Sequence, residues 1–294
     1  MEKGVKKKIY FFFILSCFVC LLSVKVAHSV IDDTIVTPSK MGQGEVGIVT
    51  VNGDKGGKPE MLWNEKRITL IPGIENKIWT AFIGVDLTLR PGKYKLKTIV
   101  GEHTDTKYIH VFKKDYGVRR LTVPKSMEAL DEQTLKRVKR ESRRIKKLFL
   151  KSAQNPLWKG AWIRPVNGPV VSPFGRRSVI NGAERSPHSG VDLKAAEGVP
   201  VKATNNGAVV LADDCFFSGV SIIIDHGGGI HSMYFHLSTS LVNTGQMVKR
   251  GDVIGLSGSS GRVTGPHLHF GVRLDGARIN PLKLIDVSRR IGAQ

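Results

Sequence analysis

The chain has 294 residues, a formal net charge of +20 and 41% hydrophobic residues. This length is sufficient for two domains of ordinary size, and the hydrophobic fraction supports a packed core and excludes wholesale disorder. A chain this basic is attracted to anionic polymers or anionic lipid surfaces, although charge alone does not reveal any chemistry.

The N-terminus has the pattern of an export signal. Several lysines precede the apolar run "IYFFFILSCFVCLLSV" at 9–24, and "AHS" at 27–29 offers small residues for cleavage after Ser29. We therefore expect a signal peptide over 1–29 and an exported protein in the periplasm or cell envelope. Two alternatives stay open: lipidation at Cys17 or Cys20, and an uncleaved membrane anchor, although a span needs about 20 residues.

Export also bears on partners and on cysteine chemistry. An exported basic protein meets anionic envelope polymers, and nucleic acid is not its natural partner. Cys215 would be the sole cysteine of the mature chain, so no intrachain disulfide is expected. Its default role is that of a small buried apolar side chain.

Residues 30–124 have an all-β pattern. Short runs rich in β-branched and aromatic residues, such as "EVGIVTV", "KIWTAFIGVD" and "KYKLKTIV", alternate with Gly, Pro, Asn and Asp. This spacing predicts a small antiparallel β-sandwich of immunoglobulin-like type. His103 and His110 are isolated in the sequence, and we expect both to be structural or surface residues.

Residues 125–155 form a basic linker that is predicted to contain a helix. Ser126 is placed to cap its start, acidic residues come early, and lysines and arginines crowd the later turns between 136 and 147. This order of charges suits the helix dipole. Two interpretations stay open: a solvated linker helix, or a basic surface that holds the protein against an anionic envelope polymer.

Residues 156–294 are β-rich and heavy in glycine. The runs "GAVVLAD", "VSIIIDH", "HSMYFHL" and "HLHFGVRL" read as strands, and long helical periodicity is absent. We expect antiparallel sheets joined by glycine-rich loops, which makes the whole chain all-β apart from the linker helix.

The stretch "TGPHLHFGV" at 264–272 places two histidines on one face of a predicted strand. Side chains at i and i+2 of a strand point the same way, so His267 and His269 lie side by side while Leu268 and Phe270 face the opposite side. Two imidazoles on one face indicate a metal site or a proton-transfer site, and the pair alone does not choose between them.

A second stretch, "SPHSGVDLKA" at 186–195, contains His188 and Asp192. Pro187 and Gly190 argue against a helix here, and on a straight strand the two side chains would lie about 13 Å apart. A turn at Ser189–Gly190 must therefore fold them together if both bind one ion. Zinc in catalytic sites takes three protein ligands and a water, and His188, Asp192 and His269 could be those three, with His267 beside the ion.

The stretch "MYFHL" at 233–237 adds His236, two positions after Tyr234 and therefore expected on the same strand face. His236 and His267 could flank an attacked carbonyl, one taking a proton and the other stabilising the oxyanion or the leaving amine. His226 is expected to order the turn before "GGG". For His231 two interpretations stay open, a place in the groove or on the solvent side.

Taken together, these stretches resemble the lysostaphin-type, LytM-like zinc metallopeptidases. The resemblance covers roughly residues 164–284 and includes, in the family's order, "SPFGRR", "HSGVDLKAAEGVPVKAT", "DHGGGIHSMYFHL" and "GQMVKRGDVIGLSGSSGRVTGPHLHF". It implies that one zinc ion is bound by His188, Asp192 and His269, and that His236 and His267 are the catalytic pair. Many members have Glu after "HLHF", where this chain has Gly271.

The resemblance also implies an activity: an exported zinc-dependent endopeptidase that hydrolyses peptide crosslinks of bacterial peptidoglycan. The rival is a catalytically inactive relative that binds the wall or activates a hydrolase. Such relatives typically lose ligands, whereas all five positions are filled here. Whether glycine bridges or D-alanyl crosslinks are cut stays open, as does the role of the N-terminal β-domain.

Overall fold

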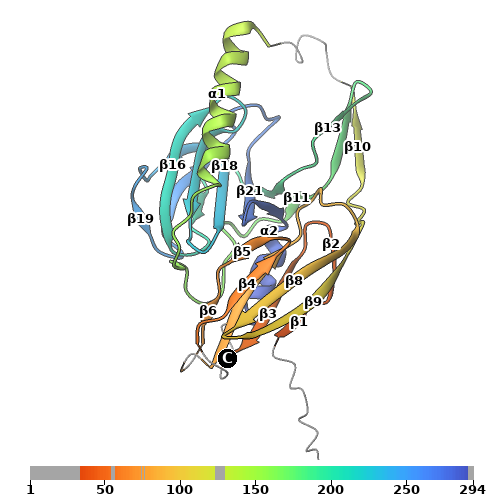
Figure 1. Ribbon diagram of the computed structural model, residues 1–294. Coiled ribbons are helices and arrows are strands. Elements are labelled where there is room, and N and C mark those ends of the chain that lie inside the picture. The colour runs from red at the N-terminus through yellow and green to blue at the C-terminus, as the bar shows by residue number, and fades with distance from the viewer. Residues whose placement is uncertain (1–33, 54–56, 74, 76, 123–129, 291–294) are drawn as a thin grey trace, which may run out of the picture. The chain divides into compact units, whose positions relative to one another are not determined.

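The computed structural model describes residues 34–53, 57–73, 75, 77–122 and 130–290 (Figure 1). The predicted signal peptide at 1–29, with Cys17, Cys20 and the alternative of a membrane anchor, lies outside the described residues, as does Ser126. Among the residues that are described, no helix is both long and apolar enough to cross a membrane.

Residues 34–112 form two β-sheets that share one hydrophobic core. Val49 and Ile83 from the first sheet and Leu96 and Ile109 from the second have no exposed surface. The antiparallel first sheet has the order β1 (Thr34–Thr37), β3 (Val46–Asn52), β7 (Ile78–Gly84), β6 (Ile71–Pro72). The second has the order β2 (Lys40–Gly42), β9 (His103–Phe112), β8 (Gly92–Val100), β4 (Glu60–Trp63), β5 (Lys66–Ile68), with β2 and β9 parallel. The all-β prediction is confirmed, and the immunoglobulin-like strand order stays a prediction.

The C-terminal part is built on a ten-stranded antiparallel sheet. Its main path runs β11 (Val170–Ser172), β14 (Gly190–Lys194), β21 (His267–Leu274), β18 (Ile230–Ser240), β17 (Gly219–Asp225), β16 (Gly207–Cys215), β19 (Met247–Val248). Off this path lie β15 (Pro200–Lys202), β20 (Val253–Ser257) and β22 (Ala277–Ile279). The predicted antiparallel sheet with glycine-rich connections is confirmed.

A short helix that the sequence pattern did not reveal closes the chain. Helix α2 (Pro281–Ser288) begins with proline, and its N-cap Asn280 accepts a hydrogen bond from the backbone N–H of Leu282. It buries Leu284 and Ile285 against the core of the C-terminal part. Two turns are too few to give a clear helical period, whereas the Asn-Pro start is a signal that could have predicted it.

The basic linker contains helix α1 (Glu132–Leu148), which is N-capped by Asp131 and not by Ser126. One side of the helix contacts β16: Arg144 pairs with Asp213, and Glu141 accepts a hydrogen bond of 3.0 Å from the backbone N–H of Phe216. Figure 1 shows α1 alongside this strand. The helix is therefore docked on one side and solvated on the other.

The N-terminal and C-terminal parts are joined by backbone and core contacts. Strand β10 (Val118–Leu121) pairs in parallel with β12 (Arg177–Ile180), which pairs with β13 (Ala183–Arg185). The rings of Phe82 and Trp158 lie 5.4 Å apart, in a core shared by both parts. The predicted boundary at residue 124 thus separates strands that hydrogen-bond to each other.

A partly buried ion pair adds a polar link between the two parts. Asp86 accepts hydrogen bonds from Arg278 at 2.7 Å (Nη2), 3.1 Å (Nε) and 2.8 Å (backbone N), and also from Thr88. Burial opposes ionisation of Asp86, but the hydrogen bonds from Arg278 outweigh it and lower the pKa of the carboxyl far below its usual range. The pair therefore stabilises the folded chain when Asp86 is ionised.

This pair predicts the behaviour of Asp86→Asn. At pH 7 the variant should lose about 1.5–3 kcal/mol of unfolding free energy, the usual value of hydrogen bonds to a charged group. Because the folded pKa is depressed, the stabilisation is present above the unfolded pKa of about 3.9 and is lost as the pH falls below it.

Urea unfolding measures the free energy of unfolding of the parent and of Asp86→Asn from pH 7 to pH 3. The difference between the two values should become smaller as the pH falls. Asp286→Asn, at a carboxyl whose side chain is 60% exposed, is the matched control and should differ little from the parent. Equal unfolding free energies of the parent and Asp86→Asn at pH 7, or a difference that does not change with pH, would contradict the proposed contribution of the ion pair.

Candidate metal centre

The pairing register of β14 and β21 places Asp192 directly opposite His269. Opposite residues of an antiparallel pair point to the same face, and Asp192 Oδ1 lies 2.9 Å from His269 Nδ1. On the other face Leu193 and Leu268 have no exposed surface. A shift of one residue in either strand would move its apolar side chains to the face of the polar groups. Burial of the apolar side chains therefore favours the register in which Asp192 and His269 lie opposite each other.

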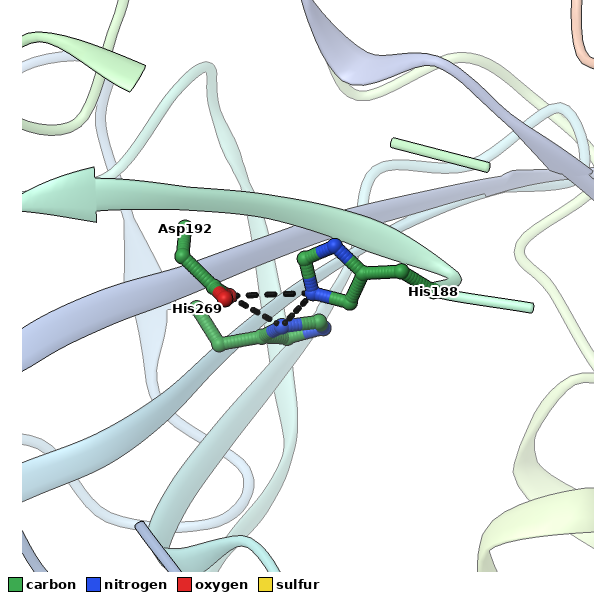
Figure 2. Close-up of side chains that lie close together, drawn as sticks. All are labelled: His188, Asp192 and His269. Carbon is green, nitrogen blue, oxygen red and sulfur yellow. Dashed lines mark hydrogen bonds and ion pairs between the residues drawn. The ribbon is translucent and has the colours of Figure 1, made fainter. Parts of the chain in front are cut away.

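His188 reaches the same point from the loop before β14. Its Nε2 lies 3.0 Å from Asp192 Oδ1 and 3.0 Å from His269 Nδ1, as Figure 2 shows. Its backbone N–H donates to the carbonyl of Arg176 at 3.0 Å, and its carbonyl accepts from the N–H of Gly175 at 2.8 Å. His188 and Asp192 therefore do lie together, but the chain makes no turn at Ser189–Gly190, because Gly190 is already the first residue of β14.

The three side chains form a donor set suited to zinc. His188 Nδ1 lies 3.0 Å from the Pro173 carbonyl, so it carries the proton and leaves the Nε2 lone pair directed at the cluster. Metal-binding histidines are typically oriented in this way by a hydrogen bond at the second ring nitrogen. Two imidazole nitrogens and one carboxylate oxygen, all within 4.8 Å of one another, match a catalytic zinc site with three protein ligands.

The charge states of the cluster suit metal binding as well. Burial opposes ionisation of Asp192, but the adjacent His188 and His269 rings, which stabilise the carboxylate when they are protonated, outweigh burial and lower the pKa of the carboxyl. Burial lowers the pKa of His269, partly offset by its hydrogen bond to Asp192. An ionised carboxylate beside a neutral imidazole is the combination that coordinates a divalent cation.

Two further histidines stand next to this cluster, with their ring centroids 5.0 Å apart. His267 Nε2 lies 3.8 Å from Asp192 Oδ1, and its Nδ1 lies 2.9 Å from the Gly265 carbonyl. His236 Nδ1 lies 3.0 Å from the Ser260 carbonyl. Each carbonyl accepts a hydrogen bond from the Nδ1–H of its histidine. The Nε2 of both rings therefore has a lone pair that can accept a proton.

The backbone at His236 corrects one prediction. Tyr234 lies opposite Phe270 in the core, whereas Phe235 lies opposite His269 on the site face. His236 has a φ of +65°, at a bulge where β18 advances three residues against two on β17. The bulge turns His236 away from the face of Tyr234 and toward His267, so the predicted shared face was wrong although His236 does belong to the site.

Phe235, Gly190 and Gly271 shape the surroundings of the site, and of these the sequence analysis did not single out Phe235. The Phe235 ring stacks on the His269 ring at 5.4 Å with an angle of 5° between the planes. A Cβ at Gly190 would lie 2.5 Å from the Phe270 carbonyl oxygen and 2.7 Å from His269 Nε2. A Cβ at Gly271 would lie 2.6 Å from the methyl carbon of Met233, which here occupies the space beside that position.

The other histidines that the structure describes lie outside the cluster. His226 is fully buried and its ring nitrogens lie 2.6 Å from the Asn206 carbonyl and 2.6 Å from Ser232 Oγ, which confirms a structural role. His231 is also buried, 3.1 Å from the Lys151 carbonyl, so neither expected position holds for it. As expected, His103 and His110 are exposed, and Cys215 is a buried free cysteine.

The fold and the donor set define a β-sheet domain with a candidate metal centre of three residues, and comparisons with known proteins show its family. Residues 186–281 match the profile of Peptidase family M23. A solved structure described as a putative peptidase M23 from Pseudomonas aeruginosa is 32% identical, with a TM-score of 0.66, and the alignment covers 82% of this chain and 94% of that one. The chain therefore belongs to peptidase family M23.

Curated relatives match over the same region. Peptidoglycan DD-endopeptidase ShyA of Vibrio cholerae is 43% identical over 98 residues, which are 33% of this chain and 23% of ShyA. Murein hydrolase activator EnvC of Escherichia coli is 37% identical over 117 residues, 40% of this chain and 27% of EnvC. The matched region thus spans about a quarter of each of these relatives.

The packing around His269 predicts the effect of Gly190→Ala. The added methyl group meets a backbone carbonyl oxygen that cannot move freely, so the variant should lose about 1–3 kcal/mol, the usual cost of overpacking. Thermal unfolding measures this loss. Gly265→Ala is the matched control, because a Cβ there meets nothing within 4 Å. Equal losses in the two variants would contradict the tight packing of Gly190 on His269.

Proposed function

We propose that the chain is an exported zinc-dependent endopeptidase that hydrolyses peptide crosslinks of bacterial peptidoglycan. The observation that carries this proposal is the convergence of His188 Nε2, Asp192 Oδ1 and His269 Nδ1 within 3.0 Å of one another, next to two carbonyl-oriented histidines. These three atoms would hold one zinc ion per chain. Signal cleavage after residue 29 and a periplasmic or envelope location are part of the same proposal.

The roles of the residues follow from their partners. When bound, zinc supplies Lewis-acid polarisation of a carbonyl and lowers the pKa of water to about 7. Burial and the neighbouring imidazole of His269 lower the pKa of His236 to about 4, so its Nε2 is unprotonated at neutral pH and suited to accept a proton. His267, held by the Gly265 carbonyl, would stabilise the oxyanion or the leaving amine.

The substrate is proposed from family membership and from the relatives. The likeness to a relative named as a peptidoglycan DD-endopeptidase favours D-alanyl crosslinks over glycine bridges. The likeness to a hydrolase activator keeps a second candidate, a chain that binds the wall without cutting it. The complete donor set and the two adjacent histidines favour the enzyme, because an activator has no need of them.

We also propose that the solvated side of α1 binds an anionic envelope polymer. The docked side uses Arg137 and Arg144, which pair with acidic residues of β16. The other side presents exposed cations with no ion pair to another described residue. They are Lys139, Arg140, Lys146 and Lys147.

Alanine variants should separate metal ligands from proton-transfer residues. His188→Ala, Asp192→Ala and His269→Ala should lose zinc and activity together, because two remaining ligands are too few for zinc. His236→Ala and His267→Ala should keep one zinc per chain, while peptidoglycan cleavage falls roughly 10²–10⁴-fold, the usual contribution of a positioned acid or base.

Elemental analysis measures the zinc content of each variant. Digestion of purified peptidoglycan, with mass analysis of the products, measures cleavage. His110→Ala is the control for both assays. Loss of zinc in His267→Ala but not in His269→Ala would reverse the assignment within "HLH". Normal digestion by all five variants would refute the metallopeptidase, and a zinc-loaded parent that cuts nothing would favour the activator.

Charge reversal on α1 tests the polymer proposal. Exposed charges are screened over about 10 Å at 0.1 M salt, so the variant should bind isolated cell wall more weakly than the parent, most of all at low salt. A variant with four exposed cations reversed in the N-terminal part is the control. The test set is Lys139, Arg140, Lys146, Lys147, and the control set is Lys40, Lys58, Lys95, Arg119. Wall binding that is independent of salt, and equal in test variant and parent, would refute the proposal.

A further inference from the structure

A cavity of about 350 Å³ lies where the N-terminal part meets the metal-site loop. Gly175, Pro187 and Tyr116 are among its lining residues. Pro187 directly precedes His188, and consecutive Cα atoms are about 3.8 Å apart, so the lining includes the chain neighbour of a candidate metal ligand. A ligand in the cavity would therefore lie within a few residues of a peptide bond placed at that centre.

The cavity is strongly cationic. Arg90, Lys113 and Arg177 line it, and none of the three forms an ion pair with another described residue. Lys114 also lines it but is paired with Glu45, and Asp115 is the single carboxylate among the lining residues. Three available cations thus face one carboxylate, which favours an anionic ligand.

The wall next to the metal centre is held in place by specific contacts. The Tyr116 hydroxyl donates to the Gln43 carbonyl at 2.6 Å, and the Tyr116 ring meets the buried Phe174 ring edge-on at 5.5 Å. Gly175 has a φ of +80°, and a Cβ there would lie 2.4 Å from the Tyr116 ring. The N–H of Gly175 donates to the carbonyl of His188, so the cavity has a fixed position relative to that ligand.

We propose that this cavity is a substrate subsite that binds a carboxylate of a peptidoglycan stem peptide. The inference rests on the proposed function, because it takes the crosslinked peptide as the substrate. Free carboxylates are the anionic groups of such peptides, and the planar guanidinium groups of Arg90 and Arg177 can each bind a carboxylate through two hydrogen bonds. The N-terminal part, through Arg90 and Lys113, would thus take part in substrate recognition.

The test compares two soluble crosslinked muropeptide dimers, one with free stem-peptide carboxylates and one with these groups amidated. The zinc-loaded full-length chain carrying Arg90→Gln, Lys113→Gln and Arg177→Gln is compared with the parent. For the free-carboxylate dimer KM should rise on the order of tenfold or more, because charge-assisted hydrogen bonds are the strong ones, while kcat stays within about twofold. For the amidated dimer the parent should already show the raised KM, and the triple variant should match it.

A control with the same loss of charge carries Lys40→Gln, Lys58→Gln and Lys95→Gln, which lie outside the cavity lining, and should behave as the parent. Calorimetry measures the Kd of both dimers for the parent and for the triple variant. Each protein also carries His236→Ala in this experiment, so that the dimers are not cleaved. An unchanged KM and Kd in the triple variant, or an equal rise for both dimers, would overturn the subsite. A parent that binds the free-carboxylate dimer more tightly than the triple variant does but cuts neither dimer would instead refute the peptidase and retain the subsite.

Discussion

Burial of one face of the β14–β21 pair is the constraint on which the site depends. Leu193, Leu268 and Phe270 have no exposed surface, so the register that hides them also sets Asp192 opposite His269 on the other face. Small residues on that face keep it open, because a side chain at Gly190 would displace the His269 ring. The same strand register therefore determines both the burial of the apolar face and the geometry of the donor set.

The centre is supported from two sides. On one side the His269 ring stacks on Phe235, which packs against a buried cluster that includes Leu211 and Met233. Leu148 and Phe149, at the end of the linker helix, pack against the same cluster. On the other side the carbonyl of Pro173 orients His188, and the next residue, Phe174, packs on Tyr116 of the N-terminal part. Segments outside the peptidase sheet thus pack against the surroundings of two of the three proposed ligands.

Much of this arrangement is visible in the sequence because it depends on period and spacing. The strand period alone places His267 and His269 together, and Pro187 and Gly190 argue against a helix at His188. The sequence could not show the bulge at His236, because a positive φ outside glycine depends on the neighbouring strands. It also could not show that the N-terminal part packs on the metal-site loop, since Tyr116 and Phe174 are far apart along the chain and only the fold joins them.

A crystal structure of the zinc-loaded chain, with anomalous scattering recorded at the zinc edge, tests the central claim most directly. The account predicts one zinc ion bound by His188 Nε2, Asp192 Oδ1 and His269 Nδ1 at about 2.0–2.2 Å. The Nδ1 atoms of His236 and His267 should remain on their backbone carbonyls. An ion bound by either of those two histidines, or bound through Nε2 of His269, would contradict it.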